Sequence, residues 1–159
     1  MNKVIINSDL KIDEDLKKEI KQLILKTLKE CRINNSLVEI FIVNEKLMER
    51  LNFKYRRKKK ATEVLSFPER KTFFPHPETK LFPLGEIFLN RSIFSAKKVP
   101  TRFRNLITVN CYWWEYLVIH SVLHLLGYHH QTIKEQLLMM RKEKFLLEKF
   151  QGSNKSKKQ

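Results

Sequence analysis

Cysteine is scarce in this sequence: Cys31 and Cys111 are the only two among 159 residues. Both lie in apolar, helix-like stretches, and their separation is not that of a disulfide framework or a thiolate zinc site. We therefore expect two reduced thiols. A domain of this length buries roughly 70% of the surface of its unfolded chain, so it needs neither a disulfide nor a metal for stability. A metal ion in this protein would therefore serve chemistry rather than hold the fold together.

We expect neither a signal peptide nor a membrane-spanning segment. Asn2 and Lys3 are polar, and the one long apolar stretch carries Asn110, Glu115 and His120. We expect a cytoplasmic protein with no membrane partner. No internal repeat is present, and the length suits a single domain.

Acidic residues are few relative to basic ones, with 17 Asp and Glu against 32 Lys and Arg, which gives a formal net charge of +15. Such an excess indicates a polyanionic partner, although composition alone leaves the partner open. The run from Lys54 to Lys60 is predicted to be a basic loop, for which a solvated surface without a partner is the simplest alternative. Residues 151–159 are predicted to form a disordered basic tail.

Short β-branched runs alternate with amphipathic helical patterns along the chain. They predict strands at Asn2–Ser8, Leu37–Val43, Thr62–Phe67 and Leu84–Asn90. Helices are predicted after Asp13, after Asn44, and at Phe94–Lys98, Ile107–Leu126 and Thr132–Phe150. The fold class is therefore α+β: a single domain over residues 1–150, with one mixed sheet of about four strands packed against helices.

Two of these helices carry specific expectations about burial. The segment Ile107–Leu126 is almost continuously apolar, so we expect it to be the central buried helix. The last helix is amphipathic, and its inward-facing residues are predicted to be Ile133, Leu137, Leu138, Phe145 and Leu146.

Three histidines follow one another at metal-binding spacing around the end of the central helix. His120 and His124 are four residues apart, which places them about 40° apart around a helix and on one face. Gly127 supplies a left-handed residue that ends the helix, so the chain can turn back and bring His130 to the same point. Three imidazoles leave a fourth tetrahedral position open for water, which is typical of a catalytic zinc site. We expect one Zn²⁺ per chain, bound by these three residues.

The alternatives to this metal site are a hydrogen-bonded core and a protease. A single histidine on an apolar helix face is usually a core residue, but three at this spacing match the H-x-x-x-H-x-x-G-x-x-H skeleton of the metzincin proteases. Those proteases carry a glutamate directly after the first histidine as general base, and Ser121 stands there in this chain. Peptide hydrolysis is therefore disfavoured, whereas metal binding is not.

Four segments resemble motifs of the YbeY family of bacterial rRNA maturation factors. The segment His120-Ser-Val-Leu-His124-Leu-Leu-Gly-Tyr-His-His130 is similar to the family's H-G-x-L-H-L-x-G-Y-D-H signature. Upstream, Leu51-Asn-Phe-Lys-Tyr-Arg56 and Ala61-Thr-Glu-Val-Leu-Ser-Phe-Pro68 resemble L-N-x-x-Y-R and T-D-V-L-S-F-P, and Leu84-Gly-Glu-Ile87 resembles L-G-D-I. The resemblance extends from Val4 to about Phe150.

The resemblance implies a single-strand-specific, metal-dependent endoribonuclease that matures the 3′ end of small-subunit rRNA and acts in ribosome quality control. It places the zinc ligands on His120, His124 and His130, and the arginine of the basic substrate cavity on Arg56. Four positions depart from the family pattern, namely Ser121 for glycine and Glu63, Glu86 and His129 for aspartates. We expect His129 not to be a ligand, because two adjacent residues after a helix end do not readily direct both rings at one ion.

Residue chemistry is consistent with RNA cleavage. The planar fork of Arg56 suits a phosphate and can oppose charge that develops on it. The expected RNA-binding residues are Arg56, Arg57, Lys58, Lys59 and Lys60. The expected partners are single-stranded rRNA and the small ribosomal subunit, with no DNA. Two other functions remain open at this point: a metal-stabilised ribosome-binding factor without its own catalysis, and a metalloprotease.

Overall fold

Four strands and four α-helices build the part of the chain that the computed structural model describes, which is residues 1–69, 75, 77–95, 99–100 and 111–155. The elements follow in the order β1 (Lys3–Asn7), α1 (Glu14–Glu30), β2 (Ser36–Val43), α2 (Glu45–Arg56), β3 (Val64–Pro68), β4 (Phe82–Asn90), the 3₁₀-helix η1 (Arg91–Phe94), α3 (Trp113–Leu125) and α4 (Ile133–Lys155). The strands form one sheet with the order β1-β2-β4-β3, in which β3 alone is antiparallel to its neighbour. The predicted α+β class with one mixed four-stranded sheet is confirmed.

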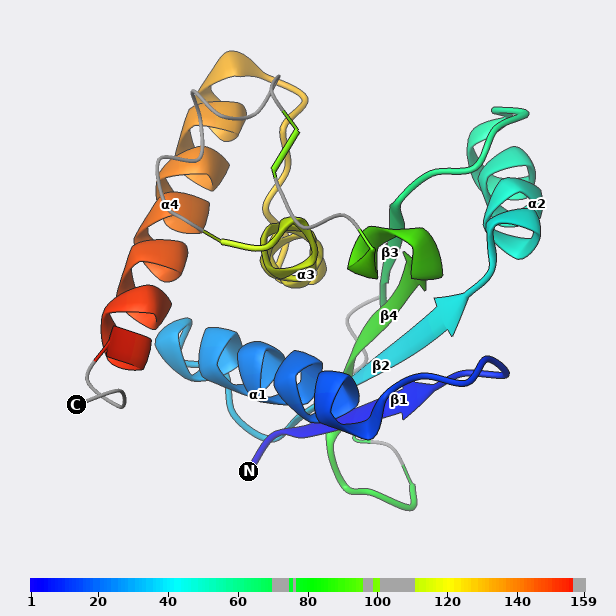
Figure 1. Ribbon diagram of the computed structural model, residues 1–159. Helices are drawn as coiled ribbons and strands as arrows, with labels where there is room; N and C mark the ends of the chain where they lie inside the picture. The colour runs from blue at the N-terminus through cyan, green and yellow to red at the C-terminus, as the bar shows by residue number, and fades with distance from the viewer. Residues whose placement is uncertain (70–74, 76, 96–98, 101–110, 156–159) are drawn as a thin grey trace.

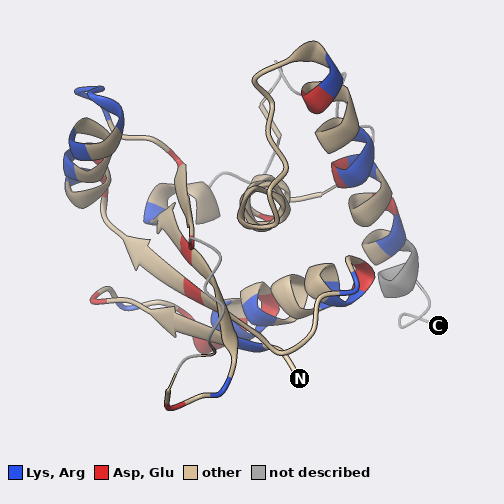
Figure 2. Cartoon of the chain, turned by 180° about the vertical axis from the view of Figure 1, so that it is seen from behind, with Lys and Arg blue, Asp and Glu red and all other residues tan. Residues whose placement is uncertain are grey.

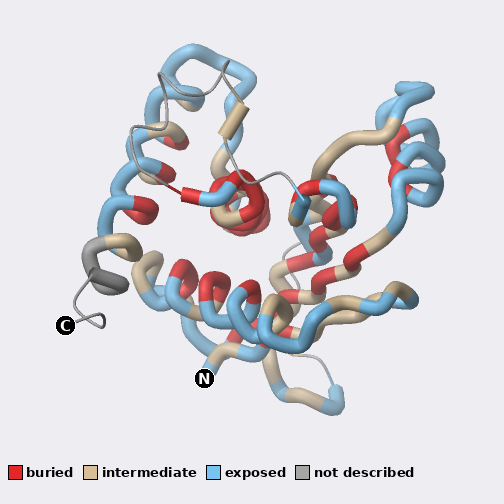
Figure 3. Tube along the Cα trace, viewed as in Figure 1, coloured by how far each residue is buried: buried red, intermediate tan, exposed pale blue. Residues whose placement is uncertain are grey.

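One face of this sheet forms the hydrophobic core. Side chains alternate between the faces of a strand, so Val38, Ile40 and Ile42 of β2 point to the same side, and all three are buried. They belong to the same core cluster as Ile24 of α1 and Val118 of α3. Helices α1 and α3 lie on this side of the sheet, and Figure 3 shows their facing sides as buried.

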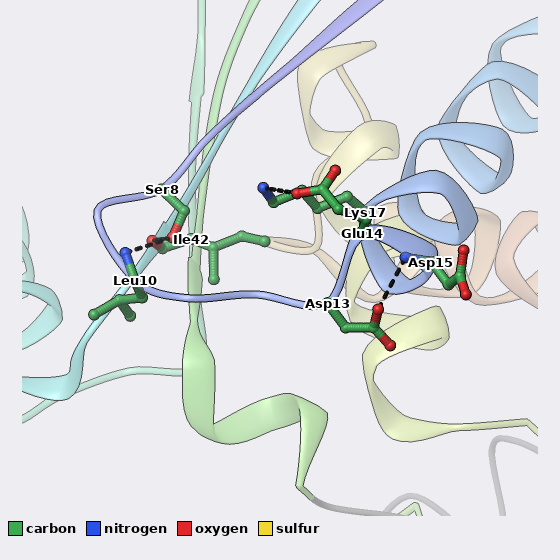
Figure 4. Close-up of polar contacts among 7 residues, drawn as sticks. All are labelled: Ser8, Leu10, Asp13, Glu14, Asp15, Lys17 and Ile42. Atoms are coloured by element: carbon green, nitrogen blue, oxygen red, sulfur yellow. Dashed lines mark hydrogen bonds and ion pairs between the residues drawn. The ribbon is translucent and has the colours of Figure 1, made fainter.

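Polar contacts fix the connection from β1 to α1 over the end of β2 (Figure 4). The Ser8 hydroxyl donates to the carbonyl oxygen of Ile42 at 2.9 Å and accepts from the Leu10 amide at 3.1 Å. Asp13 caps the helix by accepting from the Asp15 amide at 3.1 Å, as its place before the apolar pattern predicts. The entry of α1 onto the sheet is therefore set by local hydrogen bonds.

Helix α3 is the central buried helix, between the sheet, α1 and α4 (Figure 1). It begins at Trp113, because Tyr112 is extended and its amide donates to the Glu115 carboxylate at 2.8 Å. The predicted helix Ile107–Leu126 is therefore wrong at Cys111 and Tyr112, which are not helical. Residues 107–110 lie outside the described residues. None of the described helices is both long enough and apolar enough to cross a membrane.

Three other segments differ from the expectations. Lys54 to Arg56 belong to helix α2, because Lys and Arg are good helix formers; the loop begins only at Arg57, whose φ is 57°. In place of a helix at Phe94–Lys98 the chain forms η1, capped by the Asn90 side chain, and residues 96–98 lie outside the described part. Helix α4 continues to Lys155, so residues 151–155 are helical rather than part of a tail.

Helix α4 turns a different face to the core from the predicted one. Leu146 is buried as expected, but Ile133, Leu137, Leu138 and Phe145 are 79%, 47%, 51% and 48% exposed. The buried side consists of Met139, Glu143, Leu146 and Leu147. Apolar residues occur on both sides of this helix, and a glutamate interrupts the buried one, so the pattern alone indicates the wrong face.

Candidate metal centre

His120, His124 and His130, here called the histidine cluster, converge at the C-terminal end of α3. Each offers a ring nitrogen, and these three atoms lie within 4.8 Å of one another. The ring centroids of His120 and His124 are 4.5 Å apart, and that of His130 lies 5.6 Å from the first and 4.9 Å from the second. The structure thus brings together the three residues whose spacing predicts a metal site.

The turn that returns His130 to the helix depends on Gly127. Its φ is +90°, a conformation that residues with a Cβ rarely adopt. An added Cβ would meet nothing within 4 Å, so glycine is needed here for its backbone conformation and not for lack of space. The Gly127 amide donates to the carbonyl of His124 at 3.0 Å, and the Tyr128 amide donates to that of Leu123 at 3.0 Å. These bonds satisfy the last carbonyls of α3 and close the turn.

Hydrogen bonds fix the tautomer of two of the three rings. Nδ1 of His124 donates to the carbonyl oxygen of Tyr128 at 2.9 Å, since a carbonyl can only accept. Nδ1 of His120 donates in the same way to Oε1 of Glu143 at 2.6 Å. Each neutral ring therefore presents an Nε2 lone pair to the cluster, which is the atom that a metal ion would use.

The two lone pairs face each other across 3.0 Å, the distance between Nε2 of His120 and Nε2 of His124. Two acceptors in this position repel unless a cation lies between them or one ring is protonated. Burial is the main cause, and the neighbouring His120 the next, of a pKa of His124 lowered to about 4, so the His124 ring is neutral at neutral pH. The cluster could hold a metal ion, and its donors fit one that prefers imidazole nitrogen.

Glu143 of α4 is the residue of this site that sequence reasoning missed. It is only 5% exposed, and besides His120 it accepts a hydrogen bond from the Tyr116 hydroxyl. Burial and this carboxylate together raise the pKa of Tyr116 well above its ordinary value. The signal in the sequence is that this acid lies at helical spacing from Met139, Leu146 and Leu147, which places it on the same side of the helix.

The positions that depart from the family motifs have separate surroundings. His129 is exposed and is not among the described residues whose nitrogens converge. Ser121 is fully buried, and its hydroxyl has no hydrogen-bond partner in the part of the chain that the structure describes. Glu63 accepts from Nε1 of Trp113 at 2.8 Å. Glu86 lies on the face of the sheet opposite the core, next to Glu39 of β2. Its pKa is raised, mainly by burial and then by the negative charge of Glu39.

The basic segment, Lys54–Lys60, is exposed throughout at the end of α2 and in the loop that follows (Figure 2). The Asn52 side chain holds this loop by donating to the carbonyl of Lys60 at 2.7 Å. Arg56 is the last residue of α2 and makes no hydrogen bond or ion pair within the described part of the chain. Helix α2 stands apart from α3 in both views, so the structure does not bring Arg56 into the histidine cluster (Figures 1 and 2).

Comparisons with known proteins agree on one family. The family profile described as "Endoribonuclease YbeY" matches residues 4–151. A curated endoribonuclease YbeY of Clostridium botulinum strain Langeland is 35% identical, over 89% of this chain and 92% of that protein. Another, from Buchnera aphidicola, is 38% identical over 71% of this chain and 68% of its own length. A solution structure of a Thermotoga maritima protein has a TM-score of 0.58 and 25% identity, and covers 98% of this chain and 93% of its own.

Proposed function

The chain belongs to the YbeY family, and on that basis we propose that it is a metal-dependent endoribonuclease that cleaves single-stranded RNA. The observation that carries the proposal is the convergence of three histidine nitrogens within 4.8 Å, at the residues that match the family's signature. The biological role that we propose is maturation of the 3′ end of small-subunit rRNA and ribosome quality control in the cytoplasm, with the small ribosomal subunit as partner.

The donor set supports Zn²⁺, one per chain, with His120, His124 and His130 as ligands. Nitrogen ligands suit zinc, and sites with three protein ligands and one open position are catalytic rather than structural. When bound, such an ion lowers the pKa of water at the open position and polarises a phosphoryl oxygen. The protein's own contribution is to hold the rings: Glu143 and the carbonyl of Tyr128 keep both Nδ1 atoms protonated and both Nε2 atoms available.

The basic segment supplies the contacts to the RNA backbone in this proposal. Arg57, Lys58, Lys59 and Lys60 are exposed and lie in one loop, where they can each approach a phosphate. Arg56, whose guanidinium is not engaged by a described residue, is proposed to bind the scissile phosphate and oppose charge that develops there. This role requires the scissile phosphate to lie within reach of both Arg56 and the histidine cluster when RNA is bound.

The deciding experiment compares zinc-loaded and metal-free protein on single-stranded rRNA fragments. We expect cleavage only by the loaded protein, about one zinc per chain by elemental analysis, and loss of both in His124→Ala. His129→Ala is the matched control and should retain metal and activity. Loaded protein that binds RNA without cleaving it would instead favour a ribosome-binding factor. Absence of metal even after zinc titration would overturn the proposal.

A further inference from the structure

A cavity opens beside the histidine cluster between α3, α4 and the start of β3. Its volume is about 310 Å³, and its wall includes His120 and His130. Small-molecule sites in proteins usually measure about 300–1,000 Å³, so a single aromatic heterocycle fits within it. Two of the three candidate metal ligands line the cavity, so a base in the cavity and a phosphodiester at the cluster can belong to one RNA strand.

The walls of the cavity are suited to a flat, largely apolar ring. Val64, Leu117, Met139 and Met140 contribute aliphatic and thioether surface. Tyr116 lies between Trp113 and His120, with ring centroids 5.2 Å and 5.7 Å away, and so forms a rigid aromatic side of the cavity. Aromatic and apolar side chains of this kind enclose single bases that are taken out of a stack.

Two carboxylates lie among the polar groups of the cavity, and both are hydrogen-bond acceptors. Glu63 and Glu143 both line it, and Gln136 lies at its exposed side. No Lys or Arg is among its described lining residues, and its two carboxylates would repel a phosphate. Glu143 already accepts hydrogen bonds from His120 and Tyr116. Glu63 accepts from Trp113 at Oε1, and this bond does not use its Oε2. A carboxylate accepts and does not donate, so it favours a base edge that carries an amino group.

We propose that this cavity binds the base of the nucleotide next to the scissile phosphate, and that Glu63 selects bases with an exocyclic amino group over uracil. The inference rests on the proposed function, because the phosphate at the histidine cluster is what places a base at the cavity. Cytosine and uracil test it closely, since they have the same size and differ at the position that would meet Glu63: an amino donor in cytosine and a carbonyl acceptor in uracil.

The test is a titration of the zinc-loaded protein with cytidine monophosphate, uridine monophosphate and inorganic phosphate. The readout is the indole N–H resonance of Trp113, which shares the Glu63 carboxylate and is assigned with the variant Trp114→Phe. We expect the cytidine nucleotide to bind roughly tenfold more tightly than the uridine nucleotide, as for one hydrogen bond to a charged group. Glu63→Gln should retain the acceptor for Trp113 but reduce this preference to about twofold or less.

A second pair of variants locates the base. Met140→Trp should fill the cavity and remove the preference, whereas Leu138→Trp, the same kind of change on the exposed side of α4, should leave it unchanged. Equal binding of the two nucleotides to the wild type, or the same shift with inorganic phosphate alone, would overturn the inference. A preference for the cytidine nucleotide that survives in Met140→Trp would also overturn it. If Met140→Trp does not fold, the result with Glu63→Gln decides. Failure of the loaded protein to cleave any RNA is a separate result that refutes the proposed function.

Discussion

Glu143 accepts a hydrogen bond of 2.6 Å from Nδ1 of His120, and this contact joins α4 to the histidine cluster at the end of α3. A carboxylate behind a ligand imidazole fixes the ring orientation and increases the basicity of the nitrogen that faces the ion. The buried position of Glu143 has a cost in desolvation, which the bonds from His120 and Tyr116 offset. The acid is therefore held where it acts on the cluster rather than on solvent.

Replacement of Glu143 should weaken metal binding without removing a ligand. We expect Glu143→Gln to lower zinc affinity about 10-fold and Glu143→Ala about 100-fold, because glutamine still accepts from Nδ1 but carries no charge. Competition with a chelator of known affinity measures both. Glu148→Gln, an exposed acid on the same helix, is the control and should not change the affinity. An unchanged affinity in Glu143→Ala would mean that this carboxylate is only structural.

The free energy of unfolding of the metal-free protein should fall as the pH drops from about 6.5 to about 4. The pKa of His124 is lowered from 6.5 to about 4 in the folded state, so between these values the unfolded chain binds a proton that the folded chain does not. One proton gives the free energy of unfolding an upper limit of about 1.4 kcal/mol per pH unit for its slope. We expect a smaller slope, because the His124 ring is only partly buried. Urea unfolding across this range measures it. His124→Gln should flatten the dependence, and an equal slope in that variant would assign it to another group.

Removal of the Ser121 hydroxyl should stabilise the fold. The hydroxyl is fully buried on α3 and no described residue bonds to it, so Ser121→Ala should raise the free energy of unfolding by about 1 kcal/mol. Ser121→Gly, which restores the residue of the family motif, should be less stable than the alanine variant by about 1 kcal/mol, because glycine has more backbone freedom to lose in a helix. Chemical denaturation gives both values. A less stable alanine variant would show that the hydroxyl has a partner in solution.

Substitution of Arg56 should reduce cleavage of bound RNA more than it reduces binding. If its guanidinium contacts the scissile phosphate, the contact strengthens as charge develops in the transition state. Lysine should rescue the loss poorly, since a point charge lacks the planar fork. Affinity and single-turnover cleavage for Arg56→Ala and Arg56→Lys are the measurements. Equal losses in both quantities would make Arg56 an ordinary phosphate anchor.

The loop of the basic segment should determine the salt dependence of RNA binding. Each phosphate contacted on a single strand contributes about 0.7 to the log–log slope of affinity against salt, so replacing Lys58, Lys59 and Lys60 with alanine should lower the slope by about 2. The zinc content should stay the same. Alanine at Lys18, Lys21 and Lys26, exposed lysines of α1, makes the same change in net charge and should leave the slope nearly intact.

Local features of this protein were predictable from the sequence and tertiary ones were not. The shared face of His120 and His124 follows from the helical repeat. The return of His130 to that face follows from Gly127, which ends the helix three residues after His124. The contact of Glu143 depends on how α4 rotates against α3, which no local pattern specifies when apolar residues occur on both sides of the helix. The end of α2 was misplaced for a related reason, because Arg57 adopts a left-handed conformation with no glycine to mark it.

The four strands that the structure describes all precede the first histidine of the cluster in the chain. During synthesis, which runs from the N-terminus, the sheet-forming segments leave the ribosome before any ligand for the ion has been made. Pairing of β1, β2, β4 and β3 uses backbone hydrogen bonds of these segments and no side chain of the histidine cluster. The cluster is complete only once α3 and its turn have been translated, and Glu143 follows later still. A chain whose synthesis stops before His130 would thus contain every described strand of the sheet but could not bind an ion with three histidines.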